Sequence, residues 1–387
     1  VTPRRQRQMC IRDRSMTEPI TLQQDETFVL NVGPQHPATH GVLRVKMTMD
    51  GEYIYNAETV LGYIHRMHEK MAENRTYPQY MPNMGRLDYL SAMSFNHGYA
   101  LVVERACNIE VPERAEYIRV ITVELNRIAS HLVWLGAYVL DLGGFTPLMY
   151  CFDDREQILD LLEAVTGSRL TYCYFRFGGL YNDIDDDFIT GTRAFIKRMR
   201  KELKMYAKLV TGNIILMKRL KGHGPVDQNM CQRYGATGPV ARGSGINYDV
   251  RRNEPYSVYP EFDFEVPVYG EGDSYARYLV RMEEMEQSLR IIEQALDKLP
   301  DGPVNPKKKP KLIKPPPGDY YAAVETARGN FGIRMVSDGG KNAYRLKLRS
   351  PTYSNMHLFD EACRGMLIAD ALAFMGSLDL VIPEMDR

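Results

Sequence analysis

The stretch ELNRIASHLVWLGAYVLDLG, residues 124–143, carries the strongest structural signal in this chain of 387 residues. Its apolar residues continue a series that begins at Ile118 and recurs at steps of three and four residues as far as Leu135. This spacing places them on one face of a helix. Pro112 suits the start of that helix, because an N–H group at that position has no partner within the helix and proline lacks one. At the other end, Asp141 stands shortly before two glycines. We therefore predict a long core helix from Pro112 to Asp141.

The same helix carries a row of polar residues. Glu124, Arg127 and His131 share one face at positions i, i+3 and i+7. The row is either a buried ladder of polar groups or the solvated side of the helix, and the sequence leaves both interpretations open.

Helical periodicity dominates from about Val60 to Leu220. Asp153 and Glu156 form a capping-box pattern that predicts the start of a second helix, which would end at Gly167. Further helices are expected over residues 86–104, 187–209 with a solvated Lys/Arg-rich face, 273–299, and from about 358 near the C-terminus.

Two groups of strands are expected. Near the N-terminus, residues 28–32 and 42–49 have strand patterns, and Asp50-Gly51 is a hairpin turn signal. Late in the chain, a hairpin is expected from residues 322–327, 332–336 and 344–349. Together with the helices, these strands favour an α+β fold that is mainly helical.

The chain is expected to divide into five regions. The first is basic but lacks the apolar core of a secretory signal, and Met16 is the expected true start. The regions are a disordered or spurious leader (1–27), an N-terminal β-sheet region (28–60), a helical core (61–300) with an irregular loop (222–272), an exposed Pro/Lys-rich connection (301–318), and a C-terminal hairpin and helix (319–387).

Composition excludes several classes of function. Lys+Arg and Asp+Glu both number 49, so no overall charge attracts nucleic acid. No apolar run of about 18 residues is present to span a membrane. The six cysteines form no CxxC pair, so no zinc site or cysteine-held iron–sulfur cluster is predicted, and the thiols are expected to be reduced. No GxGxxG motif follows a strand, so NADH is not expected to bind this chain.

Three local patterns are candidates for chemistry or close packing. His36 and His40 have the spacing of two zinc ligands on a helix, but Pro37 places them in a loop. A loop histidine can still transfer protons near neutral pH without a metal. Tyr89, near the start of the expected helix 86–104, has the pattern of an ordinary core tyrosine. The run GATGPVARGSG, residues 235–245, resembles a phosphate loop in composition only, and we expect it to pack against other backbone.

Five segments taken together resemble one known family. They are NVGPQHPATHGVLR (31–44), GYIHRMHEK (62–70), RTYPQYMPNMGRLDYLSAM (75–93), ELNRIASHLVWLGAYVLDLG (124–143) and TGPVARGSG (237–245). In this order they are similar to the D subunit of respiratory complex I, the quinone-site or 49-kDa-type subunit of NADH-quinone oxidoreductase. The resemblance extends from about Phe28 to the last residue, Arg387.

That family in turn resembles the large subunit of nickel-iron hydrogenases, whose active site is held by two CxxC motifs. Here Arg86–Ser91 and Val381–Glu384 stand in place of the two motifs. The resemblance therefore implies a hydrogenase-like fold without metal ligands, in which the former metal pocket has become the head-group end of a quinone tunnel.

The resemblance also implies roles for individual residues. His40 and Tyr89 would hold the quinone and donate protons to it, Asp141 would bond to His40, and His36 would be a neighbour of the site. Arg66 and Arg86 would lie beside the [4Fe-4S] cluster of an adjacent subunit. Many relatives carry a histidine where this chain has Thr171, so pH-linked tuning of that cluster is not expected here.

The implied assembly is a proton-translocating NADH:quinone oxidoreductase, peripheral on the cytoplasmic side of the inner membrane. Its implied partners are the iron–sulfur B-type subunit, the C-type subunit and membrane-arm subunits, with quinone as substrate and no nucleic acid. The alternatives are the equivalent subunit of a ferredoxin- or deazaflavin-dependent oxidoreductase of quinone or phenazine, a membrane hydrogenase subunit, which the missing cysteines argue against, and a silent scaffold. The sequence leaves the electron donor and the choice of ubiquinone or menaquinone open.

Overall fold

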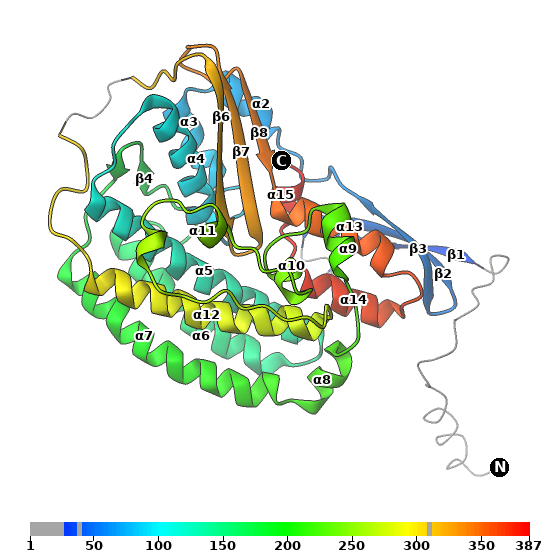
Figure 1. The fold of residues 1–387 in the computed structure, drawn as a ribbon. Coiled ribbons are helices and arrows are strands. Elements are labelled where there is room, and N and C mark those ends of the chain that lie inside the picture. Colours follow the sequence, from blue (N-terminus) through cyan, green and yellow to red (C-terminus); the bar gives the residue numbers. More distant parts are fainter. Residues whose placement is uncertain (1–26, 37–40, 308–311) are drawn as a thin grey trace, which may run out of the picture.

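Four long helices packed side by side form the centre of the computed structural model, which describes residues 27–36, 41–307 and 312–387 (Figure 1). They are α5 (Glu113–Asp141), α6 (Phe145–Thr166), α7 (Asp186–Tyr206) and α12 (Ser274–Asp297). Small antiparallel sheets lie at the sides of this bundle. The fold is therefore mixed α+β and rich in helix.

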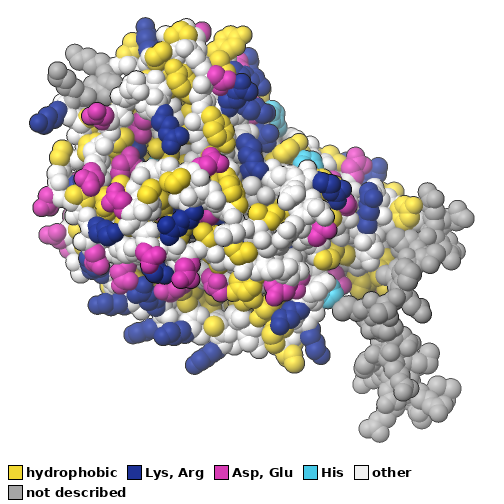
Figure 2. Space-filling model, in the orientation of Figure 1, with side chains coloured by type: hydrophobic (Ala, Val, Ile, Leu, Met, Phe, Trp, Pro, Cys, Tyr) yellow, Lys and Arg dark blue, Asp and Glu magenta, His cyan; other side chains and the backbone are white. Residues whose placement is uncertain are grey.

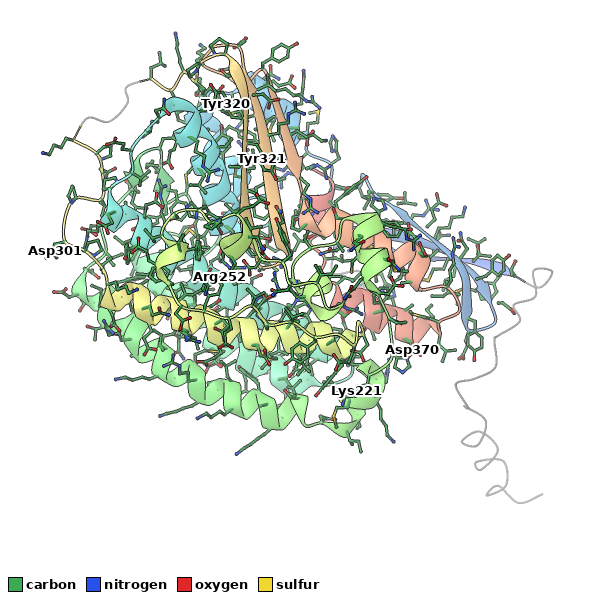
Figure 3. The ribbon with its side chains drawn as sticks, in the orientation of Figure 1. Lys221, Arg252, Asp301, Tyr320, Tyr321 and Asp370 are labelled. Carbon is green, nitrogen blue, oxygen red and sulfur yellow. The ribbon has the colours of Figure 1, made fainter. Side chains whose placement is uncertain are left out.

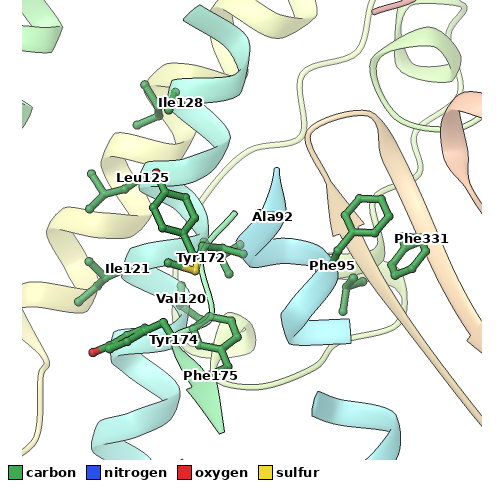
Figure 4. Packing of buried hydrophobic residues seen from close by; sticks show 14 of the residues in the cluster. Ala92, Phe95, Val120, Ile121, Leu125, Ile128, Tyr172, Tyr174, Phe175 and Phe331 are labelled. Carbon is green, nitrogen blue, oxygen red and sulfur yellow. The ribbon is translucent and has the colours of Figure 1, made fainter. Parts of the chain in front are cut away.

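The long helix α5 has the predicted bounds. Pro112 is its N-cap and Asp141 its last residue. Its apolar face is fully buried, and Figure 4 shows Ile121, Leu125 and Ile128 in the core. On the other side of this core, helix α4 (Ala92–Cys107) reaches the late sheet through Phe95, whose ring centroid lies 4.0 Å from that of Phe331. The α5 periodicity therefore identified the centre of the molecule correctly.

Helix α6 starts earlier than predicted. It begins at Phe145, directly after Gly144, and not at Asp153. Asp153 lies inside α6 and pairs with Arg198 of α7. A capping box is a local pattern of polar residues, and here the same residue types serve an ion pair between helices. The predicted end was correct, because Gly167 closes α6 in a left-handed conformation with φ of +73°.

Helix α7 has its basic residues on the outside. Lys197, Lys201 and Lys204 are exposed, and Figure 2 shows Lys and Arg side chains along the lower edge of the molecule, where α7 lies in Figure 1. The solvated Lys/Arg face predicted for this helix is confirmed. The regular helix gives way to one π-helical turn, η3 (Ala207–Thr211).

The N-terminal sheet has strand order β1-β2-β3, with β1 at Phe28–Val32, β2 at Arg44–Asp50 and β3 at Tyr53–Val60. Val45, Met47 and Ile54 are buried on its inner face, against the C-terminal helices α13 and α14. The predicted N-terminal strands are confirmed. The two ends of the chain thus share one apolar cluster, separate from the core of the helix bundle.

The late sheet contains the three strand segments predicted there. Its strands are β6 (Gly318–Thr326), β7 (Gly329–Ser337) and β8 (Arg345–Arg349), in the order β6-β7-β8. Strand β6 does not alternate between buried and exposed residues, because its second half is buried on both faces against α4 and α11. Figure 3 shows Tyr320 and Tyr321 at its outer end.

The last helix was predicted to start near Leu358, but three helices occupy this region. Helix α13 (Pro351–Ala362) starts earlier, because the Ser350 hydroxyl caps it by accepting from the Tyr353 N–H. Helices α14 (Ile368–Ser377) and α15 (Ile382–Met385) follow.

The remaining elements are short. Between α7 and α12 lie α8 (Ile214–Leu220), α9 (Gln228–Tyr234), α10 (Pro239–Gly243), α11 (Val250–Asn253) and the 3-10 turn η4 (Tyr259–Glu261); α2 (His68–Asn74), α3 (Tyr77–Met84) and the two-residue strands β4 (Phe175–Arg176) and β5 (Gly179–Leu180) complete the fold. The segment 301–318, predicted to be exposed, begins at Asp301, which Figure 3 labels. It is exposed at Leu312 but buried at Val304 and Ile313. None of the described helices has the length and apolar character to cross a membrane.

Candidate functional site

Tyr89 lies in a turn and not in a helix. The helix predicted over residues 86–104 begins only at Ala92, as α4. The carboxylate of Asp88 accepts hydrogen bonds from the N–H groups of Leu90 (3.0 Å) and Ser91 (3.1 Å) through one oxygen. Such a side-chain bond replaces the backbone bonds of a first helical turn. The turn leaves Tyr89 half-buried beside a cluster of buried charged side chains.

Two arginines and two aspartates form this charged cluster. The second oxygen of Asp88 accepts from Arg328 Nη1 at 2.7 Å, and Arg328 Nη2 lies 3.3 Å from Asp379. Arg281 Nε is 3.9 Å from the other oxygen of Asp379. All four side chains are buried. Burial raises the pKa of Asp88, and the Arg328 charge opposes this rise.

Glu384, which lies near the C-terminus, belongs to the same charged cluster. It accepts from the Ser350 hydroxyl at 2.6 Å, the Thr352 N–H at 3.1 Å and the Thr352 hydroxyl at 2.8 Å. Burial, together with the charge of Asp88, raises the pKa of Glu384 to about 7. The structure thus brings together two segments from opposite ends of the sequence, 86–91 and 381–384.

Gly238 packs closely against the backbone of Arg328. Arg328 lies in the turn between β6 and β7, and a Cβ on Gly238 would stand 2.4 Å from the Arg328 carbonyl oxygen. Gly238 has φ of +67°, which L side chains rarely adopt. The run 235–245 therefore packs against backbone, as predicted, and includes the short helix α10.

Asp141 lies on another side of the candidate site. It is the exposed last residue of α5, and its Oδ2 is 3.9 Å from the position that a Cβ would take on Gly376 of α14. The same glycine accepts a hydrogen bond from Trp134 Nε1 at 2.8 Å. His40, the expected partner of Asp141, lies outside the described residues, whereas His36 is described and exposed.

Two of the three residues expected near a partner's cluster lie in adjoining segments. Gly85, next to Arg86, would place a Cβ 3.4 Å from the carbonyl oxygen of Tyr172, which follows Thr171. Asn96 Nδ2 donates to that same oxygen at 2.6 Å. The third residue, Arg66, is exposed in the segment before α2. The role of all three beside a cluster stays a prediction.

A buried polar network adjoins the site, and sequence reasoning left it undecided. The row on α5 is a buried ladder: Arg127 Nε donates to Glu124 at 3.0 Å, and His131 Nε2 lies 2.9 Å from Glu284 of α12. Burial acts to raise the pKa of Glu124, but Arg127 and Arg251 lower it to about 2. Three polar residues at helical spacing within an apolar helix were the available signal.

Comparison with known proteins shows the family of the chain. Residues 141–315 and 307–387 match the family described as the 49 Kd subunit of respiratory-chain NADH dehydrogenase. Three relatives are named as D subunits of NADH-quinone oxidoreductase, the second of them with the suffix 2. The protein of Desulfotalea psychrophila is 78% identical over 96% of this chain and 100% of its own length. That of Opitutus terrae is 66% identical over 94% of this chain and 91% of its own length. That of Syntrophobacter fumaroxidans is 55% identical over 94% and 97%. The chain therefore belongs to the family of the 49-kDa subunit of complex I.

Proposed function

We propose that this chain is the quinone-site subunit of a proton-translocating NADH:quinone oxidoreductase and shares its site with a neighbouring subunit. Relatives that cover nearly the whole chain are named as the D subunit of that enzyme. The structural observation that supports the proposal most directly is the position of Tyr89. Its phenol is half-buried beside a cluster of buried charged side chains, and a partly exposed phenol can donate a proton to a substrate oxygen.

The chemistry follows from the side chains. A quinone that takes up two electrons becomes strongly basic in a dry site, so it needs donors that first stabilise and then protonate it. Tyr89 supplies a phenol whose pKa is raised by burial and by the charge of Asp88, so it keeps its proton until a strong base arrives. His40 would be the second donor, and Asp141 would orient its ring.

The electrons would come from a [4Fe-4S] cluster of the partner B-type subunit. Arg66 and Arg86 would face it, and their positive charge favours the reduced form of a cluster. The backbone contact between the segments of Arg86 and Thr171 fits a shared surface of this kind. In this proposal the chain itself binds no metal.

Exposed apolar side chains support a place within a larger assembly. Phe145 and Met149 at the start of α6, with Ile214 and Ile215 of α8, are 55–66% exposed. Monomeric proteins rarely expose several large apolar side chains so close together, and such patches mark protein or membrane contacts. We propose contacts with C-type and membrane-arm subunits and a peripheral position on the cytoplasmic side of the inner membrane.

The main alternative differs only in the electron donor. A ferredoxin- or deazaflavin-dependent enzyme would use the same quinone or phenazine site, because the donor binds on other subunits. Purification of the native assembly, followed by assays with NADH, ferredoxin and reduced deazaflavin, distinguishes these possibilities. Ubiquinone and menaquinone analogues compared in the same assays identify the acceptor.

The test of the site is Tyr89→Phe. This change removes one hydroxyl with little change of volume, so the complex should assemble while quinone reduction falls by about 100-fold. Reduction of an artificial acceptor upstream of the quinone should persist. Asp141→Asn should have a milder effect, because the amide can still hydrogen-bond His40.

The matched control is Tyr344→Phe, since Tyr344 is an exposed tyrosine, 68% accessible, in the loop before β8. It should leave both activities unchanged. If Tyr89→Phe reduced quinone as fast as this control, Tyr89 would be only a structural residue.

A further inference from the structure

We propose that Glu384 is a proton-holding group of the quinone site, which takes protons from a surface cavity and passes them towards Tyr89. The proposal rests on the proposed function and extends it to a residue for which no role follows from the resemblance. Three observations support the proposal: the charge balance of the buried cluster, the hydrogen bonds of the carboxyl groups in that cluster, and the cavity next to α15.

The charge balance of this cluster calls for one proton. Among the residues that the structure describes, three buried carboxyl groups, those of Asp88, Asp379 and Glu384, face two buried guanidinium groups, those of Arg281 and Arg328. A buried charge without a partner is costly, and a carboxyl group in this situation binds a proton instead. One of the three carboxyl groups is therefore neutral near neutral pH.

A third guanidinium group, that of Arg349 at the end of β8, also interacts with Glu384, but it is only partly buried, so solvent screens its charge more than the charges of Arg281 and Arg328. The Arg349 guanidinium is also committed to backbone oxygens, donating to Asn330 at 2.6 Å and to Gly235 at 2.6 Å. At the start of α13, the N-cap residue Ser350 and Thr352 bond to Glu384 through neutral groups.

The hydrogen bonds favour Glu384 over Asp88 as the carboxyl group that holds the proton. All the bonds of Asp88 come from groups that can only donate: the N–H groups of Leu90 and Ser91 and the guanidinium of Arg328. A proton on Asp88 would break one of them. Glu384 meets two hydroxyl groups, and a hydroxyl can accept as well as donate. Its protonated form can therefore keep these contacts, and its raised pKa agrees with this assignment.

A surface cavity lies next to the residues that flank Glu384. It has a volume of about 370 Å³ and is lined by Met385 and Asp386, which follow Glu384, and by Tyr353, which follows Thr352. His65 and Glu69 also line it. The residues that flank Glu384 and its hydroxyl partner thus reach a space that water can enter, whereas Glu384 itself is buried.

On its inner side Glu384 interacts with Asp88, the residue before Tyr89. The proton balance is as follows. The O–H bond of Tyr89 breaks as its proton moves to an oxygen of the reduced quinone; the proton released by Glu384 restores the phenol by way of water, and a hydronium ion from the cavity reprotonates the carboxylate and becomes water. The electrons come from the partner's cluster, and no residue of this chain is oxidised or reduced.

The test is the pH profile of quinone reduction by the intact complex with Glu384→Gln. The variant should be at least about tenfold slower than the wild type at about pH 6, where Glu384 holds its proton. The two rates should converge at about pH 9, where the wild-type carboxyl group has lost it. Glu384→Asp, which keeps a carboxyl group, should restore part of the pH dependence.

The matched control is Asp154→Asn. Asp154 is also a buried carboxyl group, but it lies between α6 and α7 and bonds to Tyr206 and Arg198. The control should keep the wild-type profile. A rate for Glu384→Gln equal to that of the wild type at about pH 6, or a loss by the same factor at every pH, overturns the proposal.

Infrared spectroscopy tests the wild-type complex directly, even if Glu384→Gln does not assemble. A C=O band of a protonated carboxyl group should weaken as the pH rises through about 7. Absence of any such pH-dependent band overturns the proposal. Failure of the proposed function would give a different result from failure of the Glu384 proposal. In that case the complex with Tyr89→Phe would reduce quinone at the normal rate, whatever the protonation state of Glu384.

Discussion

Thr171 has a backbone conformation that bears on its replacement by histidine. Its φ is +52°, a region that is uncommon for a β-branched residue and that histidine enters more readily. Thr171→His should therefore be compatible with the fold. A histidine beside a cluster binds its proton more tightly when the cluster is reduced, so the potential of the cluster falls as pH rises. Threonine cannot titrate.

We accordingly predict a nearly pH-independent potential for the partner's terminal cluster in the wild-type complex. Thr171→His should introduce a slope that approaches about 59 mV per pH unit, for one proton per electron. Redox titration followed by electron paramagnetic resonance at several pH values measures both slopes. A steep slope with Thr171 in place would show that another group, such as His131 or a residue of the partner, already supplies this coupling.

At the residue scale, the sequence pointed to Tyr89 through the family resemblance and misjudged its setting. The apolar residues of 86–104 predicted a helix through Tyr89, and they could not reveal that Asp88 would bond to the Leu90 and Ser91 N–H groups. That bond depends on Arg328, 240 residues away, which holds the other oxygen of Asp88. Local patterns cannot contain such a partner.

At the scale of elements, the turn between β6 and β7 depends on a glycine in another segment. Gly238→Ala would add a Cβ 2.4 Å from the Arg328 carbonyl oxygen, at a φ of +67°. We predict a loss of stability of at least about 1–3 kcal/mol from backbone strain alone. Displacement of Arg328 should also lower quinone reduction. Thermal unfolding and activity of the purified complex measure the two effects.

Gly270→Ala is the control for this change. Gly270 has nothing within 4 Å of the position of its Cβ, and its φ lies outside the strained range. The substitution should leave stability almost unchanged. Equal melting temperatures for the two variants would mean that the segment of Gly238 can yield without cost.

Helices α5 and α6 show which elements could be predicted. The start of α5 follows from Pro112 and a long apolar period, both of which are local. The start of α6 does not, because its exposed apolar residues Phe145 and Met149 give no amphipathic period, and the polar pair Asp153 and Glu156 imitates a cap. If these exposed apolar residues contact another subunit, as we propose, the periodicity of this chain alone cannot predict them.

At the scale of the whole molecule, buried ion pairs join elements that lie far apart in the sequence. Arg242 of α10 pairs with Glu284 of α12 and, at 2.8 Å, with Glu325 of β6. Arg251 of α11 pairs with Glu124 of α5 at 3.2 Å. The α5 periodicity showed that polar residues lie in the helix, but nothing in the sequence pairs them with residues of the segment 222–272. That segment, predicted to be irregular, supplies Arg242 and Arg251 of the network.

The network leads to a last prediction, Glu124→Gln. Glu124 is fully buried, and the substitution would leave the buried positive charges of Arg127 and Arg251 without this carboxylate partner. Removal of one member of a buried ion pair costs about 3–5 kcal/mol. The melting temperature of the complex should therefore fall clearly at neutral pH. Asp319→Asn, which breaks the exposed pair with Arg334 on the late sheet, should not change it measurably.

The pH dependence of this difference tests its electrostatic origin. The pKa of Glu124 is lowered from 4.5 to about 2 in the folded state. A group with a lowered pKa stabilises the fold fully above its unfolded pKa, and this contribution is lost as pH falls towards the folded value. The gap in melting temperature between wild type and Glu124→Gln should thus be constant above about pH 5 and narrow below about pH 4.5. A gap that stays the same down to the lowest pH at which the complex remains folded would mean that Glu124 acts through packing and not through its charge.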